Sequence, residues 1–422
     1  MKRILFFLFL FPAFQQNLAQ DAFFKDALKS NRERLYRNIV KNTITANLST
    51  PLNDSTEELW QDAFWAMEVI NYRSPWTDNK IMVAMDSIQN STLSFQRSIL
   101  ELIYTNYPLQ YDSQVIDLLE RSQDPKIFAM CGAYLLMSNK QYYQNKSVSD
   151  RIVSKYKSDP GNPLLLELLY QLQFFNHKRP LTKLEKFLAK DYLPGNVLII
   201  SFQRKDRNYP GLVIVRDTSG NFIKDDDGNY FSVPQLARSI SNLPGYLTNG
   251  NTPEGIFRMD GFDHSKSNFI GPTTNIQLTM PFEFKASHFY KDSTLADSIW
   301  NVDAYKNLLP ENFRNYFPMM QSYYAGKAGR TEIIAHGTTV DPAYYKEKPY
   351  YPLTPTQGCL CSKEIWSEAT GKLLESDQQK LANAVAKAGG PDGYAIVINI
   401  DDKQEPVSIN DIIPFLKLAI QK

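Results

Sequence analysis

Two short segments in the second half of this chain carry a histidine and a cysteine that could act as base and nucleophile. His336 lies in the run Ile333-Ile-Ala-His-Gly-Thr-Thr339, and Cys359 lies in Thr354-Pro-Thr-Gln-Gly-Cys-Leu-Cys361. A thiol becomes a nucleophile when a base or a positive field favours its thiolate, and histidine is the usual base. The chain contains four histidines and three cysteines, so few other pairs are available. The pattern therefore predicts Cys359 as a nucleophile with His336 as its base.

The residues around this pair favour a strand before the histidine and a loop before the cysteine. The apolar run that ends at Ala335 is typical of a short strand. Gly358 stands directly before Cys359, where backbone N–H groups can turn toward a developing oxyanion. We therefore expect an oxyanion site near Gly358 and Cys359.

These segments, together with a third, resemble the signature of the L,D-transpeptidase catalytic domain (YkuD-type). The family pattern is a His-Gly step, a gap and then Ser/Thr-His-Gly-Cys. The third segment, Gly250-Asn-Thr-Pro-Glu-Gly-Ile-Phe-Arg258, is similar to the family's Thr-Pro-x-Gly-x-Phe turn and strand. All three follow the family's order. The resemblance implies a catalytic set of Cys359, His336, Gly358 and Gly337.

The resemblance also implies acyl transfer on peptidoglycan stem peptides through a thioester on Cys359. The donor bond would join a diamino acid to D-alanine, and an amine acceptor would complete transpeptidation. Water as the acceptor would instead make the protein an L,D-carboxypeptidase or amidase. Two departures leave a catalytically degenerate peptidoglycan-binding protein open as well. Gln357 replaces the histidine before Gly-Cys, and Cys361 replaces the usual Arg or Asn.

Further residues near the motifs are candidates for substrate binding. Arg330 could receive a substrate carboxylate or be a solvated arginine at a strand end, and the tyrosines could form an aromatic wall or pack in the core. We expect no cofactor and no metal, because Cys-x-Cys is tighter than usual zinc spacing and the other ligands, His264 or His288, are scattered. The substrate-binding candidates are Thr338, Gln357, Thr356, Arg330, Tyr344 and Tyr351.

Composition and the N-terminus bear on location and partners. The formal net charge of +1 gives no electrostatic case for a nucleic-acid partner. Residues 1–20 combine a basic start with a short apolar run that is too short to span a membrane. This pattern predicts a cleaved signal peptide, a periplasmic protein and no integral membrane segment after cleavage. An uncleaved anchor helix is the alternative.

Residues 21–190 predict an all-α domain. Asp124-Pro125 is typical of an N-cap followed by a first-turn proline. A second Asp-Pro pair at Asp159 hints at stacked helical hairpins of a solenoid, and an irregular bundle is the alternative. None of these residues predicts chemistry, so we expect the domain to position the second half or to bind a protein partner.

The remaining residues predict a mainly β domain. Runs at 197–202 and 211–217 are rich in β-branched residues and bounded by turns. The predicted fold class is therefore multidomain, with the helical domain followed by a mainly β, L,D-transpeptidase-like catalytic domain at 191–402. Within it, residues 285–331 predict a helical insertion placed to act as a lid. A C-terminal helix is predicted within 403–422.

Overall fold

The structure is a computed structural model that describes residues 22–138, 146–174, 183–267, 269–297 and 299–420. The predicted signal peptide, residues 1–20, lies outside the described residues. Within the described part of the chain, every helix is too short or too polar to cross a lipid bilayer.

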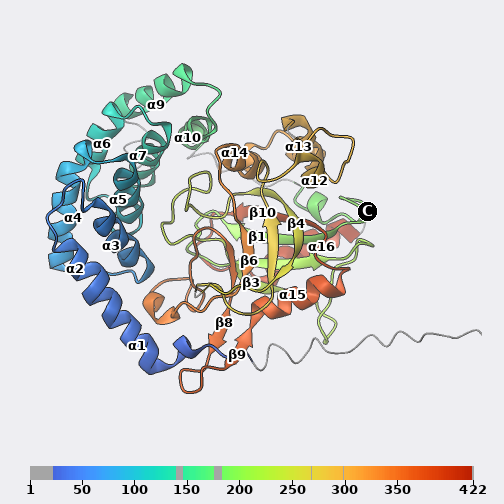
Figure 1. Cartoon of the computed structure of the whole chain (residues 1–422). Helices are drawn as coiled ribbons and strands as arrows, with labels where there is room; N and C mark the ends of the chain where they lie inside the picture. The colour runs from blue at the N-terminus through green and yellow to red at the C-terminus, as the bar shows by residue number, and fades with distance from the viewer. Residues whose placement is uncertain (1–21, 139–145, 175–182, 268, 298, 421–422) are drawn as a thin grey trace, which may run out of the picture.

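The N-terminal region consists of helices that pack in succession. Helix α3 contacts α5, α5 and α6 contact α7, and α10 contacts both α7 and α9. Together they form a curved row that wraps one side of the rest of the molecule (Figure 1). The N-terminal region is therefore helical, as the sequence predicts. The helices are α1 (Lys29–Asn38), α2 (Ala46–Leu48), α3 (Glu57–Val69), α4 (Pro75–Ser87), α5 (Leu93–Asn106), α6 (Asp112–Arg121), α7 (Pro125–Ser138), α9 (Lys146–Ser158) and α10 (Pro163–Phe174).

Local sequence explains where several of these helices begin. The Asp124 carboxylate accepts the N–H groups of Lys126 and Ile127 at the start of α7, as the Asp-Pro pattern predicts. Helix α4 begins at a proline after Ser74, whose hydroxyl exchanges bonds with Thr77 in a capping box. These caps satisfy backbone donors that the first turn of a helix leaves without partners.

The second half is built around a closed barrel of eight strands. Its order is β1-β10-β4-β5-β6-β7-β3-β2. The pairs β1–β10 and β6–β7 are parallel, and the other pairs are antiparallel. The strands are β1 (Val197–Arg204), β2 (Gly211–Arg216), β3 (Val233–Leu236), β4 (Gly255–Asp263), β5 (Asn275–Thr279), β6 (Ile334–His336), β7 (Leu360–Ser362) and β10 (Gly393–Asp401). A separate hairpin pairs β8 (Glu364–Trp366) with β9 (Leu373–Ser376).

The predicted fold class is therefore wrong for the second half. A closed mixed barrel with helices around it is not the β-sandwich of an L,D-transpeptidase-like (YkuD-type) domain. The closing strands β3, β6 and β7 are three or four residues long, and β3 contains Pro234, which argues against a central strand. The pairing of these strands depends on contacts between residues far apart in sequence. Runs of three or four residues contain too little of a hydrophobic pattern to predict that pairing.

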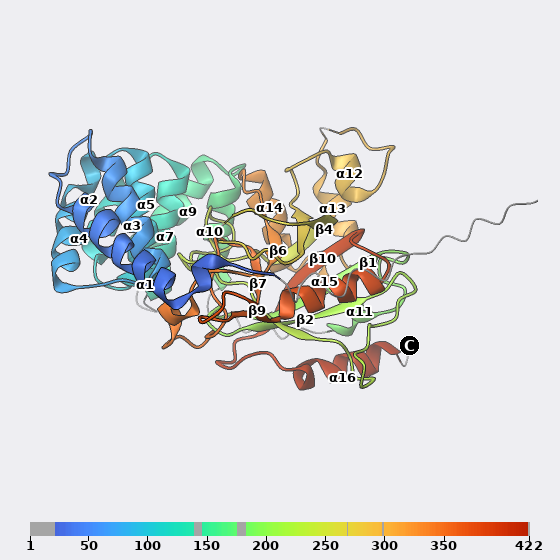
Figure 2. The ribbon, with the colours of Figure 1, turned by 60° about the horizontal axis from the view of Figure 1, so that its bottom comes forward.

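Two cores hold the barrel together. Alternate residues of β1 enter different cores, with Val197 and Ile199 in one and Leu198, Ile200 and Phe202 in the other. Helix α15 (Asp377–Lys387) contributes to the first core, and α11 (Glu185–Leu188) and α16 (Ile409–Ile420) to the second. Figure 2 shows α16 running along the barrel on the side away from the helical row. Burial on both faces fixes the register of the central strands.

The segment predicted as a lid is largely packed into the second core. It contains α12 (Ala286–Tyr290), α13 (Val302–Leu308) and α14 (Gln321–Lys327). Tyr305 is fully buried, and its hydroxyl accepts the N–H of Ile256 on β4 at 2.8 Å. This anchoring ties the segment to the barrel, and a lid role for it stays a prediction.

Candidate active site

The barrel brings Cys359 and His336 onto adjacent strands. In the parallel β6–β7 pair, Ala335 lies opposite Leu360 and His336 opposite Cys361. Cys359 immediately precedes β7, and its sulfur accepts the N–H of Ile334 at 3.5 Å. Cys359 therefore stands one residue before the strand that pairs with the strand of His336.

In this resting arrangement the thiol bonds to the main chain. The sulfur accepts the Ile334 N–H, and the thiol donates to the Glu332 carbonyl at 3.5 Å. Neither of these two partners is the His336 imidazole. Catalytic hydrogen bonds are often long before substrate binds, so this geometry is compatible with a base that engages later.

Burial dominates the electrostatics of the thiol. It raises the pKa of Cys359 to about 11, and the carboxylates of Glu332 and Glu283 add to this rise. The Ile334 N–H and the guanidinium of Arg330 oppose it by favouring the thiolate. The sulfur of the half-buried Cys359 therefore carries its proton at neutral pH.

Arg330 is a buried cation beside the thiol, with 5% of its surface exposed. Its guanidinium donates to the main-chain carbonyls of Gly245, Gly250 and Asn251. Burial lowers its pKa to about 10, which still leaves it charged at pH 7. The interpretation as a solvated arginine is therefore wrong, and a role for Arg330 in receiving a substrate carboxylate stays a prediction.

Gly358 fits this arrangement because it lacks a side chain. Its φ of +118° favours glycine, and a Cβ would lie 2.1 Å from a terminal nitrogen of Arg330. Its N–H donates to the hydroxyl of Thr356, and that hydroxyl donates to the Cys359 carbonyl. Thr252 donates to the Gly358 carbonyl. The N–H predicted to face an oxyanion is thus bonded to Thr356, and Thr356 braces the cysteine loop.

His336 is buried and neutral. Burial lowers the pKa of its imidazole to about 4. Its Nδ1 lies against the carbonyl of Gly337, and a carbonyl can only accept, so Nδ1 carries the hydrogen. The lone pair of the neutral ring is then on Nε2. His336 can therefore take a proton at Nε2 while Gly337 fixes the tautomer.

A buried carboxyl group, that of Glu364, packs against the Gly337 turn. A Cβ on Gly337 would lie 2.1 Å from its carboxyl carbon, and a Cβ on Gly271 would lie 2.1 Å from Oε2. The hydroxyls of Thr273 and Ser376 donate to Oε1. Burial raises the pKa of Glu364 to about 7. Sequence reasoning missed this residue, because nothing in Cys361-Ser-Lys-Glu364 marks a glutamate as buried.

The other predicted substrate-binding residues are scattered. Thr338 is buried, and its hydroxyl donates to the carbonyl of Phe269 at 3.2 Å. The rings of Tyr344 and Tyr36 of α1 pack together with their centroids 5.9 Å apart, and both residues line a cavity of about 450 Å³. Gln357 and Tyr351 are exposed. Of these, Gln357 lies nearest to Cys359 along the chain and is accessible to a ligand.

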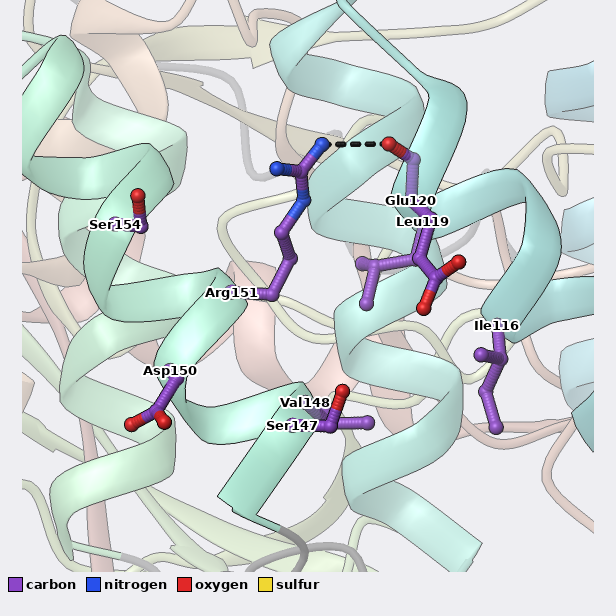
Figure 3. A pocket seen from close by; sticks show the side chains of 8 residues that line it. All are labelled: Ile116, Leu119, Glu120, Ser147, Val148, Asp150, Arg151 and Ser154. Carbon is purple, nitrogen blue, oxygen red and sulfur yellow. Dashed lines mark hydrogen bonds between the residues drawn. The ribbon is translucent and has the colours of Figure 1, made fainter.

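A second cavity, of about 350 Å³, lies in the helical region between α6 and α9. Figure 3 shows Arg151 donating to the main-chain oxygen of Glu120 there. Its lining residues include neither Cys359 nor His336, so this cavity is separate from the candidate active site.

Zinc is not supported as an alternative use of these side chains. Among the described residues, no group of three or more His, Cys, Asp and Glu is placed to hold a metal ion. His264 contacts Thr274, and His288 contacts Asp260 at 2.7 Å. Cys361 is fully buried with a free thiol.

Comparison with protein-family models, curated proteins and solved structures gives no match to this chain.

Proposed function

We propose that the protein is a cysteine-dependent acyltransferase in which Cys359 is the nucleophile and His336 the base. The observation that carries this proposal is a half-buried thiol beside a buried guanidinium, one residue before the strand that pairs with the strand of His336. Reactive cysteines need a base or a positive field close by. Arg330 supplies the field and His336 the base.

The proposed chemistry starts from a neutral thiol and a neutral imidazole. His336 Nε2 takes the Cys359 proton as the sulfur attacks an amide carbonyl, giving a tetrahedral oxyanion. The imidazolium then protonates the leaving amine, and a thioester remains on Cys359. An acceptor amine then attacks the thioester and passes a proton to His336. The C–S bond breaks as the new amide forms, and the His336 imidazolium returns the proton to the Cys359 sulfur.

For the substrate we propose peptidoglycan stem peptides, which the resemblance of the three sequence motifs to the L,D-transpeptidase family implies. A signal peptide at residues 1–20 would deliver the protein to the periplasm, where this polymer lies. If water were the acceptor, the same thioester would make the protein an L,D-carboxypeptidase or amidase. We propose transfer to an amine first, because the motif resemblance favours it.

Covalent trapping tests the nucleophile whichever acceptor the protein uses. A carbapenem offers a strained acyl group, and intact mass of the full-length mature protein should show one adduct, mapped to Cys359. A C131A variant should keep the adduct, because Cys131 is buried in the helical core. Absence of an adduct, with no turnover of muropeptides, would favour a degenerate binding protein.

Muropeptide products separate the two enzymatic alternatives. Purified stem peptides incubated with and without an added amine acceptor should give a cross-linked product in the first case. Tetrapeptide shortening that is indifferent to the amine would point to hydrolysis.

A further inference from the structure

We infer that the helical region is part of the active-site machinery, because it holds the loop that fixes Arg330 against Cys359. This loop, residues 243–252, is here called the bridging loop. The inference deepens the proposed function, since it rests on Cys359 being the reactive thiol. It also gives the helical region a role that its own side chains do not suggest.

One side of the bridging loop belongs to the helical region. Leu243, Tyr246 and Leu247 are buried within the hydrophobic core that the helices form. Three side-chain hydrogen bonds add to this packing, each to a different helix. They are Tyr246 to Gln171 on α10 at 2.9 Å, Lys126 on α7 to Thr248 at 2.9 Å, and Asn249 to Glu101 on α5 at 3.1 Å.

The main chain of the same loop surrounds the guanidinium of Arg330. The carbonyls of Gly245, Gly250 and Asn251 are its acceptors. Next along the chain, the hydroxyl of Thr252 donates to the carbonyl of Gly358 at 2.8 Å. The loop therefore contacts both the cation and the residue before Cys359.

The helix contacts of the bridging loop can affect Cys359 because the loop fixes the position of the charged Arg330 guanidinium. The attraction between a cation and a thiolate grows as their distance shortens and as water is excluded. A guanidinium held by three carbonyls has little freedom to turn away. If the loop moved, Arg330 could turn toward the exposed carboxylate of Glu332, and the thiolate would lose its nearest positive charge.

The two residues before the loop also brace it, so each helix contact should contribute only part of the effect. The Ser241 hydroxyl donates to the Asn249 carbonyl, and the Asn251 amide donates to Asn242. Removing one helix contact should therefore loosen the loop without unfolding it. Removing two contacts should have a larger effect.

The experiment measures the reactivity of the thiol itself. Iodoacetamide alkylation of Cys359 in the folded full-length protein is followed against pH by peptide mass spectrometry. Cys131 and Cys361 are fully buried and serve as internal unreactive thiols. Because this assay needs no acyl donor, failure of the proposed acyl transfer would leave its result interpretable.

Two substitutions remove helix contacts with little other change. Y246F deletes the hydroxyl that reaches Gln171, and N249G deletes the amide that reaches Glu101 while glycine accepts the φ of +57°. N71G is the matched control, because Asn71 is exposed at the end of α3 with a φ of +48°. E101Q keeps an oxygen acceptor for Asn249 and should behave like the wild type, whereas E101A should behave like N249G.

We expect the alkylation rate at pH 8 to fall about threefold in N249G and about tenfold in Y246F/N249G, since one pKa unit is tenfold in thiolate. N71G should match the wild type. Adding R330M to Y246F/N249G should cause little further loss, because the loop acts through Arg330. Unchanged pH profiles in folded loop variants, or fully additive effects with R330M, would overturn the inference.

Discussion

The two sides of the candidate active site are built in different ways. On the thiol side, a buried cation is held by main-chain carbonyls, and a glycine with positive φ makes room for it. On the imidazole side, a buried carboxyl group packs behind a glycine turn, and the ring bonds to a main-chain carbonyl. A nearby charge thus affects the reactivity of the thiol, whereas a hydrogen bond and close packing fix the orientation of the imidazole.

This difference has a consequence for the order of proton transfer. The pKa of Cys359 is raised to about 11 and that of His336 is lowered to about 4, in both cases chiefly by burial. Both shifts favour the neutral pair at pH 7. A resting thiolate–imidazolium pair is therefore not expected, and the proton should move only as the sulfur attacks its substrate.

The largest effect should come from removing the nucleophile. C359A should abolish both the carbapenem adduct and any muropeptide turnover, because the other two thiols among the described residues are buried. Intact mass and product analysis check this, with C131A as the control. Turnover that survives in C359A would show that Cys359 is not the nucleophile.

Removing the base should separate acyl transfer from thiol reactivity. H336A should slow thioester formation by about 10²–10⁴-fold, the usual contribution of a general base. The iodoacetamide profile of Cys359 should stay unchanged, because the resting imidazole carries no charge. In the wild type, acylation should fall only as the pH drops toward about 4, where His336 becomes protonated.

Stopped-flow acylation and alkylation in parallel provide these two readouts. An H336A variant whose alkylation profile shifts to higher pH would indicate that a charged pair already exists at rest.

Removing the buried cation should act on the thiol directly. R330M should lower Cys359 alkylation at pH 8 by about tenfold, equivalent to one pKa unit, because the positive charge that favours the thiolate is lost. R330K keeps the charge and should recover part of the rate. Chemical denaturation of both variants tests whether the carbonyls left without a donor lower the stability of the fold. Equal rates of Cys359 alkylation in wild type and R330M would contradict the argument that the charge favours the thiolate.

The smallest effect on chemistry, and a distinct effect on stability, should come from Glu364. Burial raises its pKa from 4.5 to about 7, so the folded state binds this proton more tightly than the unfolded state. The associated stability is complete below about pH 4.5 and is lost as the pH rises through about 7. E364Q should remove this dependence, a difference of up to about 3 kcal/mol between pH 4 and pH 8.

Urea unfolding of wild type and E364Q at the two pH values measures that difference. E364Q should keep most acyl transfer, because a neutral amide can still pack against the Gly337 turn. If the free energy of unfolding changed equally between the two pH values in wild type and E364Q, Glu364 would not be the titrating group.

The sequence predicts individual helices and strands of this protein better than the way in which they pair. The Asp124-Pro125 start of α7 and the strands at 197–202 and 211–217 follow from local chemistry and are present. Closure of the barrel depends on pairings such as Gln235 with Ser362, which join short runs far apart in sequence. Local patterns contain no information about such partners.

The same limit explains which residues of the candidate site could be predicted from the sequence. His336 and Cys359 were identifiable because their residue types are reactive and their neighbours form a motif. Arg330 looked like a surface residue because its three acceptors are carbonyls, and any residue type could supply them. Glu364 had no sequence signal, since its burial follows from two glycines brought beside it by the fold.

The parallel direction of β6 and β7 makes the geometry of the pair independent of how many residues separate them. A parallel pair needs a crossover connection, and here it travels outward to α3, where the hydroxyl of Tyr345 donates to the carbonyl of Val69. The length of this connection can therefore vary at exposed positions such as Lys346 and Glu347, while the strand register keeps Cys359 directly before the strand beside that of His336. Chains built on this plan should be sought by that register, and a search keyed to a fixed His-to-Cys interval would miss many of them.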